Sequence, residues 1–214
     1  MRIVIAGGHG QIALRLERLL AARGDAPVGL IRNPEHAADL TAAGAEPVVT
    51  DLEQVSVAAL ADHLAGADAV VFAAGAGPGS GDARKDTVDR GASALLADAA
   101  QAAGVRRFVQ VSSMGADRAE LGSDSFSVYL RAKAAAEADL RTRDLDWTIL
   151  RPGGLTNDPG TGRVRLAPST GRGSVPRDDV AAVLLALLDA PTTVGMTIEL
   201  ISGDSSVGDA VAGL

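Results

Sequence analysis

The start of the chain, residues 2–14, constrains the fold more than any other stretch. Residues 2–6 are mostly apolar and β-branched, three glycines follow within four positions, and an amphipathic stretch begins at Leu14. This order predicts a buried strand, a tight turn and a helix, because glycine adopts backbone angles that a Cβ forbids. The helix would present its free N–H groups and the positive end of its dipole to the turn. The stretch therefore predicts an anion-binding turn at the start of an α/β fold.

The spacing of the glycines indicates which kind of anion the turn binds. It can be described as Gly7-x-x-Gly10-x-x-Ala13 or as Gly8-x-Gly10-x-x-Ala13, and in both a small residue lets the helix pack closely on the strand. Either spacing, placed between a strand and a helix, matches the dinucleotide fingerprint, whereas the alternative is a turn with a purely structural role. We expect the turn to bind the diphosphate of a dinucleotide. The residues predicted to bind it are Gly7, Gly8, His9, Gly10, Gln11 and Ile12.

The composition argues against several classes of function. The chain has no cysteine, and its three histidines, His9, His36 and His63, lack the spacing of metal ligands, so we expect no metal site. A net charge of −7 without a basic run disfavours binding to nucleic acid or to anionic membranes. An apolar span of about 18 residues and a signal-peptide pattern are both missing, which predicts a cytoplasmic protein.

Strand and helix patterns alternate along the whole chain. Strands are predicted at residues 2–6, 27–31, 46–49, 69–73, 107–111, 147–150 and 196–200. A length of 214 residues, 47% of them hydrophobic, suits one domain with a core of Ala, Val, Leu and Ile. We therefore predict an α/β, single-domain Rossmann fold over residues 1–214, with a doubly wound parallel sheet of about seven strands. One helix should run from about 82 to 103, and the irregular segment 154–176, with a short strand at 164–166, should lie on the substrate side.

Two positions that follow predicted strands concern the adenosine half of the dinucleotide. Arg32 follows the second strand, where an acidic residue would bind the 2′-hydroxyl of NAD and an arginine suits the 2′-phosphate of NADP. NADP is therefore favoured over NAD, and the alternative is a solvated arginine ahead of a turn. Asp51 and Leu52 follow the third strand and could hold the adenine. Asp51 is equally explained as the N-cap of the next helix, with Gln54 completing a capping box.

A stretch of small residues follows the fourth strand. It begins with Ala73, Ala74 and Gly75 and continues with Gly, Ala, Pro and Ser to residue 81. Small residues at the carboxyl end of a parallel strand let a ligand pass close to the backbone, while the alternative is a flexible loop. We predict that the first three residues of this stretch line the cofactor.

The chemistry is predicted from Tyr129 and Lys133, which lie four residues apart in an Ala-rich predicted helix and so share one face. This is the only tyrosine of the chain, and the chain uses arginine for nearly all of its 20 basic residues, so the pairing is less expected by chance. A cation one helical turn away favours the phenolate, and a phenol so tuned can protonate a carbonyl oxygen as hydride reaches the carbon. Ser112 or Ser113, after the fifth strand, could hydrogen-bond the same oxygen. The alternative is an exposed tyrosine beside a solvated lysine.

The ordered set of motifs resembles the short-chain dehydrogenase/reductase superfamily and, within it, the atypical branch of NAD(P)H-binding proteins. The motifs are Gly7-x-x-Gly10-x-x-Ala13, Arg32, Asp51-Leu52, Ala73-Ala74-Gly75, Ser112-Ser113, Tyr129-x-x-x-Lys133 and Arg151-Pro152-Gly153-Gly154. The resemblance implies a catalytic triad of Ser113, Tyr129 and Lys133. Asp89 would stand where the superfamily usually has Asn. The further cofactor contacts that the resemblance implies are Ser112, Lys133, Pro152 and Gly153, of which the last two would border the nicotinamide.

Three functions are compatible with these motifs. The leading hypothesis is an NADP-dependent oxidoreductase that transfers hydride to or from a small carbonyl, alcohol or enone. The second is a protein that holds NADP(H) without turnover and signals through a partner. The third is a sugar-nucleotide epimerase or dehydratase, which would need a further substrate region where few residues follow Leu200. We expect a small-molecule substrate, no nucleic-acid or membrane partner, and a monomer or weak homodimer.

Overall fold

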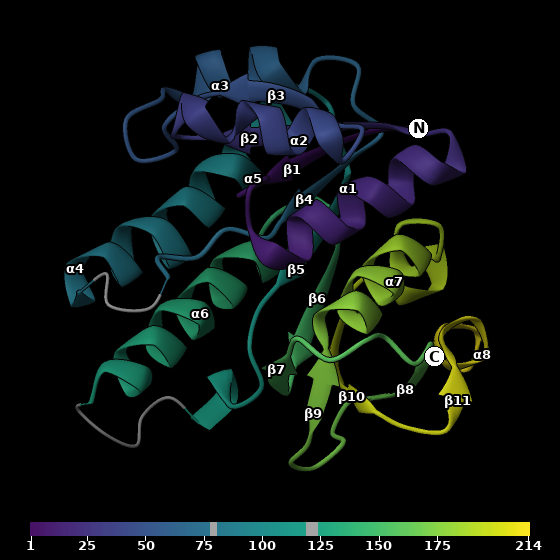
Figure 1. Ribbon diagram of the computed structural model, residues 1–214. Helices are drawn as coiled ribbons and strands as arrows, with labels where there is room; N and C mark the ends of the chain where they lie inside the picture. Colours follow the sequence, from purple (N-terminus) through teal and green to yellow (C-terminus); the bar gives the residue numbers. More distant parts are fainter. Residues whose placement is uncertain (78–80, 119–123) are drawn as a thin grey trace.

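A nine-stranded sheet forms the centre of the molecule in the computed structural model, which describes residues 1–77, 81–118 and 124–214 (Figure 1). Its strands are β1 (Arg2–Ala6), β2 (Ala26–Ile31), β3 (Glu46–Val49), β4 (Ala69–Phe72), β5 (Arg107–Val111), β6 (Asp146–Pro152), β8 (Arg163–Ala167), β10 (Met196–Ser202) and β11 (Ser205–Ser206). They lie in the order β11-β8-β10-β6-β5-β4-β1-β2-β3. A second, small sheet pairs β7 (Gly154–Thr156) in parallel with β9 (Ser174–Pro176).

Helices connect the strands of the large sheet. The α-helices are α1 (Gln11–Arg23), α2 (Ala37–Ala42), α3 (Val57–Leu64), α4 (Asp82–Arg84), α5 (Ser93–Ala102), α6 (Ser125–Arg141), α7 (Arg177–Leu188) and α8 (Val207–Ala212). Short 3₁₀ turns are η1 (Pro34–His36), η3 (Ala116–Arg118) and η4 (Pro191–Thr193), and η2 (Lys85–Ala92) is a π-helix. Among the described residues, no helix is both long enough and apolar enough to cross a bilayer.

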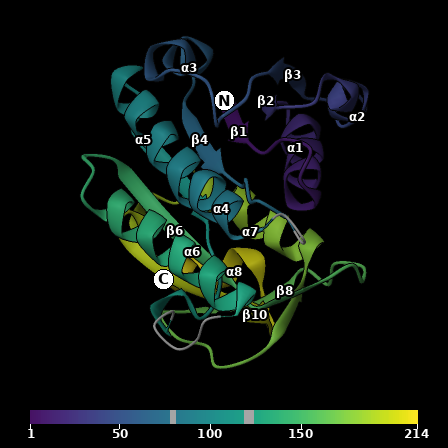
Figure 2. The same cartoon turned by 90° about the vertical axis from the view of Figure 1, so that its left-hand side faces the viewer.

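The sheet is covered by helices on both faces, as a doubly wound fold requires. Helices α1 and α7 pack on one face, and α3, α5 and α6 pack on the other (Figures 1 and 2). Successive side chains of a strand point to opposite faces, so Ile3 and Ile5 join the first core while Val4 and Ala6 join the second. Both faces of the sheet are therefore buried, which explains why the parallel strands are apolar throughout.

The predicted fold class is confirmed, but the predicted count of strands is wrong. Seven strands, β3-β2-β1-β4-β5-β6-β10, are parallel and correspond to the seven that the sequence predicts. Strands β8 and β11 extend the sheet beyond β10 in antiparallel pairings. β8 includes the short strand predicted at 164–166 in the segment 154–176, and its exposed arginines at positions 163 and 165 interrupt the apolar pattern of a central strand.

The helix predicted for residues 82–103 is three elements rather than one. It begins as α4, widens into the π-helix η2 and continues as α5. A π turn holds more residues than an α turn and is frequent at functional sites. Here the widened turns bury the charged side chains of Lys85 and Asp89 near the carboxyl end of the sheet. The ordinary helical pattern of the sequence does not reveal such a change.

Candidate cofactor and substrate site

The glycine turn between β1 and α1 has the geometry of a diphosphate cradle. Gly7 has a φ of +82°, and a Cβ there would lie 2.7 Å from the Cα of Ala74. A Cβ on Gly10 would lie 3.0 Å from the carbonyl oxygen of Gly7. Gly10 is also the N-cap of α1 and brings no side chain to cap the helix, so the first N–H groups stay open to a ligand. These residues fit the diphosphate of a dinucleotide.

The other residues of the turn support it in different ways. Gly8 donates its N–H to Leu30 O at 3.0 Å, and a Cβ on Gly8 would lie 2.7 Å from the Cα of Gly29, so this glycine lets the turn rest on β2. His9 stacks on His36 with 3.6 Å between ring centroids. Ile12 packs against the core, and the carbonyl of Gln11 accepts a hydrogen bond from Arg15 at 2.8 Å.

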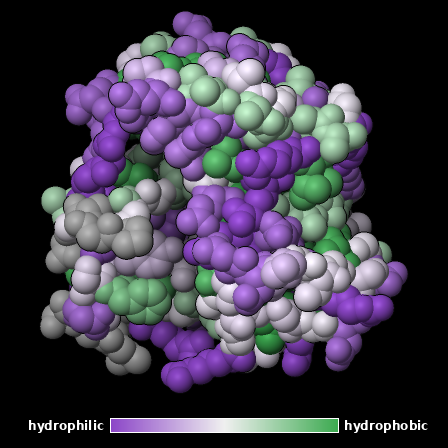
Figure 3. Space-filling view, in the orientation of Figure 1, coloured by the Kyte–Doolittle hydropathy of each residue, from purple (hydrophilic) through white to green (hydrophobic). Residues whose placement is uncertain are grey.

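A first pocket of about 330 Å³ extends from the turn across the ends of β2, β3 and β4. Figure 3 shows a recess on the left of the face in view, with hydrophilic side chains along its upper rim. Nine predicted cofactor residues line the pocket: Gly7, His9, Gly10, Arg32, Asp51, Leu52, Ala73, Ala74 and Gly75. The sequence analysis missed Leu30, Ile31, Asn33, His36, Thr50, Glu53, Arg84 and Val88. Pro78, Gly79 and Ser80, in the predicted glycine-rich stretch, lie outside the described residues.

The structure excludes one of the two interpretations of Asp51, the N-cap. The N-cap of α3 is Ser56, whose hydroxyl accepts the N–H of Ala59 at 3.2 Å, so Asp51 does not cap that helix. Its carboxylate instead accepts the N–H of Glu53 at 3.0 Å within a tight turn. This turn holds Asp51 and Leu52 at the wall of the first pocket.

A second pocket of about 610 Å³ adjoins the first, since Gly75 lines both. Its volume is within the range of small-molecule sites. Tyr129 and Asp89 line this pocket, as predicted for a substrate site. Ala76 and Gly77, from the predicted stretch of small residues, and Leu155, from the predicted substrate-side segment 154–176, also line it. The sequence analysis did not anticipate Lys85, Ser125 and Phe126, of which Lys85 has a recognisable signal because lysine is so rare in this chain.

Lys133 joins the site residues of α6 to those of the sheet and of η2. Its ammonium forms an ion pair with Asp89 at 3.1 Å, and both side chains are almost fully buried. The same nitrogen donates to the carbonyl oxygens of Ala74 and Val111, each at 3.3 Å. It also lies 5.7 Å from the centre of the Tyr129 ring. The structure thus brings Tyr129, Lys133 and Asp89 together, as the resemblance implies.

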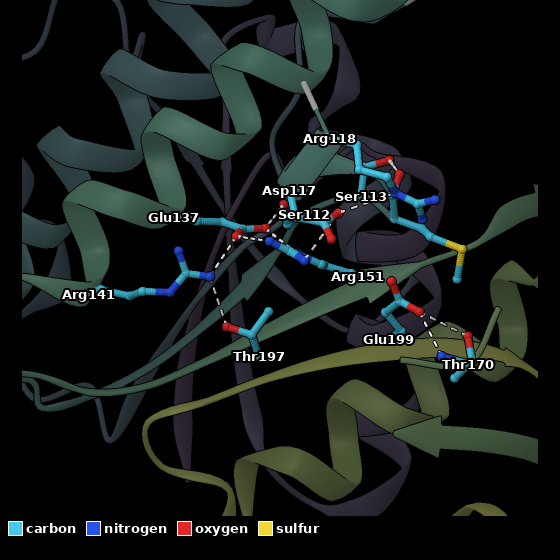
Figure 4. Close-up of polar contacts among 11 residues, drawn as sticks. Ser112, Ser113, Asp117, Arg118, Glu137, Arg141, Arg151, Thr170, Thr197 and Glu199 are labelled. Carbon is cyan, nitrogen blue, oxygen red and sulfur yellow. Dashed lines mark hydrogen bonds and ion pairs between the residues drawn. The ribbon is translucent and has the colours of Figure 1, made fainter. Parts of the chain in front are cut away.

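The two serines after β5 have different surroundings. Ser112 is buried and donates its hydroxyl to Glu137 at 2.6 Å (Figure 4). Glu137 also accepts two hydrogen bonds from Arg151, at 2.8 and 2.6 Å, and these bonds raise the pKa of the guanidinium. Ser113 is half-buried, and among the described residues its hydroxyl makes only a 3.3 Å bond to the carbonyl oxygen of Met114. The hydroxyl of Ser113 is therefore held by a longer hydrogen bond than that of Ser112.

Residues at the end of β6 have a packing role. A Cβ on Gly153 would lie 2.4 Å from the carbonyl oxygen of Gly173, so glycine allows the chain to pass beside β9. The carbonyl of Pro152 accepts the N–H of Met114 at 3.0 Å and ties the loop after β5 to the sheet. Among the described residues, neither Pro152 nor Gly153 lines the two pockets, and neither do Ser112, Ser113 and Lys133.

Comparisons with known proteins agree with this geometry. The profile of an NAD(P)H-binding family matches residues 7–191. YhfK of Bacillus subtilis (strain 168), named an uncharacterized sugar epimerase, is 37% identical over 212 residues that cover 99% of each chain. A Bacillus halodurans structure named as a candidate NAD-dependent epimerase/dehydratase superposes over 100% of both chains, with a TM-score of 0.94 and 35% identity. ChuY, an anaerobillin reductase from Escherichia coli O157:H7, covers 96% of this chain and 99% of its own, with a TM-score of 0.81 and 27% identity. The chain therefore belongs to the NAD(P)H-binding family of Rossmann-fold proteins.

Proposed function

We propose that this protein is an NADP-dependent oxidoreductase that acts on a small, apolar carbonyl compound or on the corresponding alcohol. The observation that supports it most is the meeting of two pockets at Gly75. One pocket has a dinucleotide-binding turn, and the other holds the only tyrosine of the chain beside a buried Lys133–Asp89 ion pair. The similar reductase ChuY is consistent with this reaction type.

The residues of the second pocket would divide the reaction between them. Bound NADPH would supply the hydride for the carbonyl carbon, and the carbonyl oxygen would then need a proton. Tyr129 would donate that proton from its hydroxyl and recover it from solvent. The Lys133 ammonium, 5.7 Å from the centre of the Tyr129 ring, would attract the negative charge that this proton transfer leaves on the tyrosine, and it would orient the nicotinamide ribose. Ser113 would hydrogen-bond the substrate oxygen, because Ser112 already donates to Glu137.

The pocket walls indicate an apolar substrate. Phe126 is 62% exposed and Leu155 is 40% exposed, although large apolar side chains are normally buried. Both line the second pocket, and the ring of Phe126 lies 5.9 Å from that of Tyr129. An apolar group of the substrate would remove these side chains from water.

A cofactor-binding protein without turnover is the second candidate. Three oxygen atoms already surround the Lys133 ammonium, from Asp89, Ala74 and Val111. An ammonium has three N–H donors, so these oxygens can engage all of them. A lysine held in this way would fasten α6 to the sheet, which suits a protein that senses the cofactor.

The Tyr129→Phe variant separates these functions. It should bind NADPH with unchanged affinity and lose about 10²- to 10⁴-fold in rate with a panel of aromatic and aliphatic carbonyl compounds. Binding is measured by titration of NADPH fluorescence, turnover by NADPH absorbance, and correct folding by circular dichroism. Unchanged turnover in Tyr129→Phe would contradict the catalytic role. Tight NADPH binding by the native protein without hydride transfer to any compound would favour the sensor, and interconversion of sugar-nucleotide isomers would favour an epimerase.

A further inference from the structure

One carboxylate holds two arginines at the adenosine end of the first pocket. Arg32 follows β2, Glu53 lies in the turn after β3, and Arg84 ends α4. The Oε2 atom of Glu53 accepts from Arg32 Nη1 at 3.3 Å and from Arg84 at 2.9 Å through Nη2 and 3.3 Å through Nε. All three side chains line the pocket. Elements far apart in the sequence thus meet at a single oxygen atom.

The Glu53 carboxylate is also held from its other side. Its Oε1 accepts the hydroxyl of Thr87, on η2, at 2.6 Å. This hydrogen bond and the two arginines keep the pKa of Glu53 below its ordinary value, so the group is ionised at neutral pH. Two guanidinium groups and one carboxylate give the three-residue cluster itself a net charge of +1, and the carboxylate of Asp51 lines the same pocket.

The arginines keep donors that Glu53 does not use. A guanidinium has five N–H donors, and Glu53 engages one nitrogen of Arg32 and two of Arg84. Both side chains are partly exposed, 55% for Arg32 and 37% for Arg84. The cluster therefore offers fork-shaped donors to an anion that enters the pocket, and guanidinium pairs of this kind bind phosphate oxygens well.

We propose that Arg84 is a second binding residue for the 2′-phosphate of NADP, and that Glu53 competes with this phosphate for both guanidinium groups. The inference rests on the NADP preference in the proposed function and adds two residues to it. A phosphate monoester carries more negative charge than a carboxylate and has three terminal acceptor oxygens, so it can replace Glu53 between the arginines. NAD carries a hydroxyl at that position and does not compete with Glu53.

Two substitutions should therefore act in opposite directions. Arg84→Ala removes one guanidinium, and hydrogen bonds to charged groups are strong enough that the affinity for NADP should fall about tenfold. Glu53→Gln removes the competing charge and keeps the shape of the side chain, so the affinity for NADP should rise. The affinity for NAD should change little in either variant.

The experiment is a titration of the native protein and each variant with NADP and with NAD by isothermal calorimetry. Arg32→Ala serves as the reference for loss of the first guanidinium. The matched control is Arg90→Ala; Arg90 lies on η2, pairs with Asp86 at 2.6 Å and lines neither of the two pockets described above. The measured quantity is the ratio of the two dissociation constants, and this control should leave the ratio unchanged.

Each outcome bears on a separate claim. A lower NADP-to-NAD preference in Arg84→Ala, together with a higher one in Glu53→Gln, supports the inference. An equal loss of affinity for both cofactors in Arg84→Ala, or no loss, overturns the role of Arg84. A weaker NADP affinity in Glu53→Gln overturns the competition. If the native protein binds NADP and NAD equally well, the NADP preference in the proposed function is wrong. The native protein and the Arg32→Ala variant test that preference separately from the roles of Arg84 and Glu53.

Discussion

A buried carboxyl group in α1 should make the stability of this protein depend on pH. Glu17 is fully buried behind the glycine turn, and its Oε1 lies only 2.6 Å from the place where a Cβ on Gly29 would be. Within the described part of the chain, neither carboxylate oxygen has a hydrogen-bond partner. Burial therefore raises the pKa of Glu17 from 4.5 to about 8, against a smaller opposing effect of Arg18.

The size of the effect follows from the difference between the folded and unfolded states. Between pH 4.5 and 8 the native protein holds a proton on Glu17 that the unfolded chain has lost, so stability falls as the pH rises. Each pH unit in this window costs about 1.4 kcal/mol, or roughly 3 kcal/mol by pH 7. Above the native pKa the carboxylate is ionised in both states, and the loss stops growing.

The substitution Glu17→Gln keeps the shape of the side chain and removes its titration. We expect the variant to have nearly native stability at pH 5 and to be more stable than the native protein at pH 7, by up to about 3 kcal/mol. Urea unfolding followed by circular dichroism at half-unit steps from pH 5 to 8 measures both curves. Glu46→Gln, at an exposed position of β3, is the control and should follow the native curve. Parallel curves for Glu17→Gln and the native protein would refute the reasoning.

Two further predictions concern the cofactor turn and the serines. Gly7→Ala should abolish cofactor binding in calorimetry, because its Cβ would collide with backbone, whereas Gly104→Ala, which has a similar φ but open space around it, should lose about 1–2 kcal/mol of stability and keep binding. Ser113→Ala should lower turnover at unchanged stability. Ser112→Ala should instead lower the free energy of unfolding by about 1 kcal/mol, since Glu137 loses a hydrogen bond; an identical effect of both serine variants on rate would contradict this division of roles.

Some parts of the site could be predicted from the sequence because the residues that form them lie within a few positions of one another. The turn at Gly7 and Gly10 needs special backbone angles and close approach, and both needs appear directly as glycine in the sequence. Tyr129 and Lys133 are one helical turn apart, so a helix of any placement puts them on one face. Asp89 could be placed beside them only through a resemblance, because it comes from a different helix.

The contacts between distant segments were not predictable in this way. Glu53 meets Arg32 and Arg84 because β2, β3 and β4 end at the same edge of the sheet, and charged residues in loops carry no periodic signal. The widening of the helix at η2, the strand β11 and the antiparallel pairing of β8 with β10 were likewise not predicted, since they depend on contacts with neighbouring elements; only the position of β8 was predicted, as the short strand at 164–166.

The sequence by itself determined the alternation of apolar strands with helices, and therefore the doubly wound parallel sheet and the position of the dinucleotide turn. These features follow from periodicity and from the backbone demands of glycine, which act within a few residues. The tertiary structure alone decided which side chains share a pocket. It placed Gly75 in the wall of both pockets, paired the Ser112 hydroxyl with Glu137 and left the Glu17 carboxylate without a hydrogen-bond partner in the described part of the chain. Such outcomes depend on the crossing of elements many residues apart, where packing rather than local preference sets the distances.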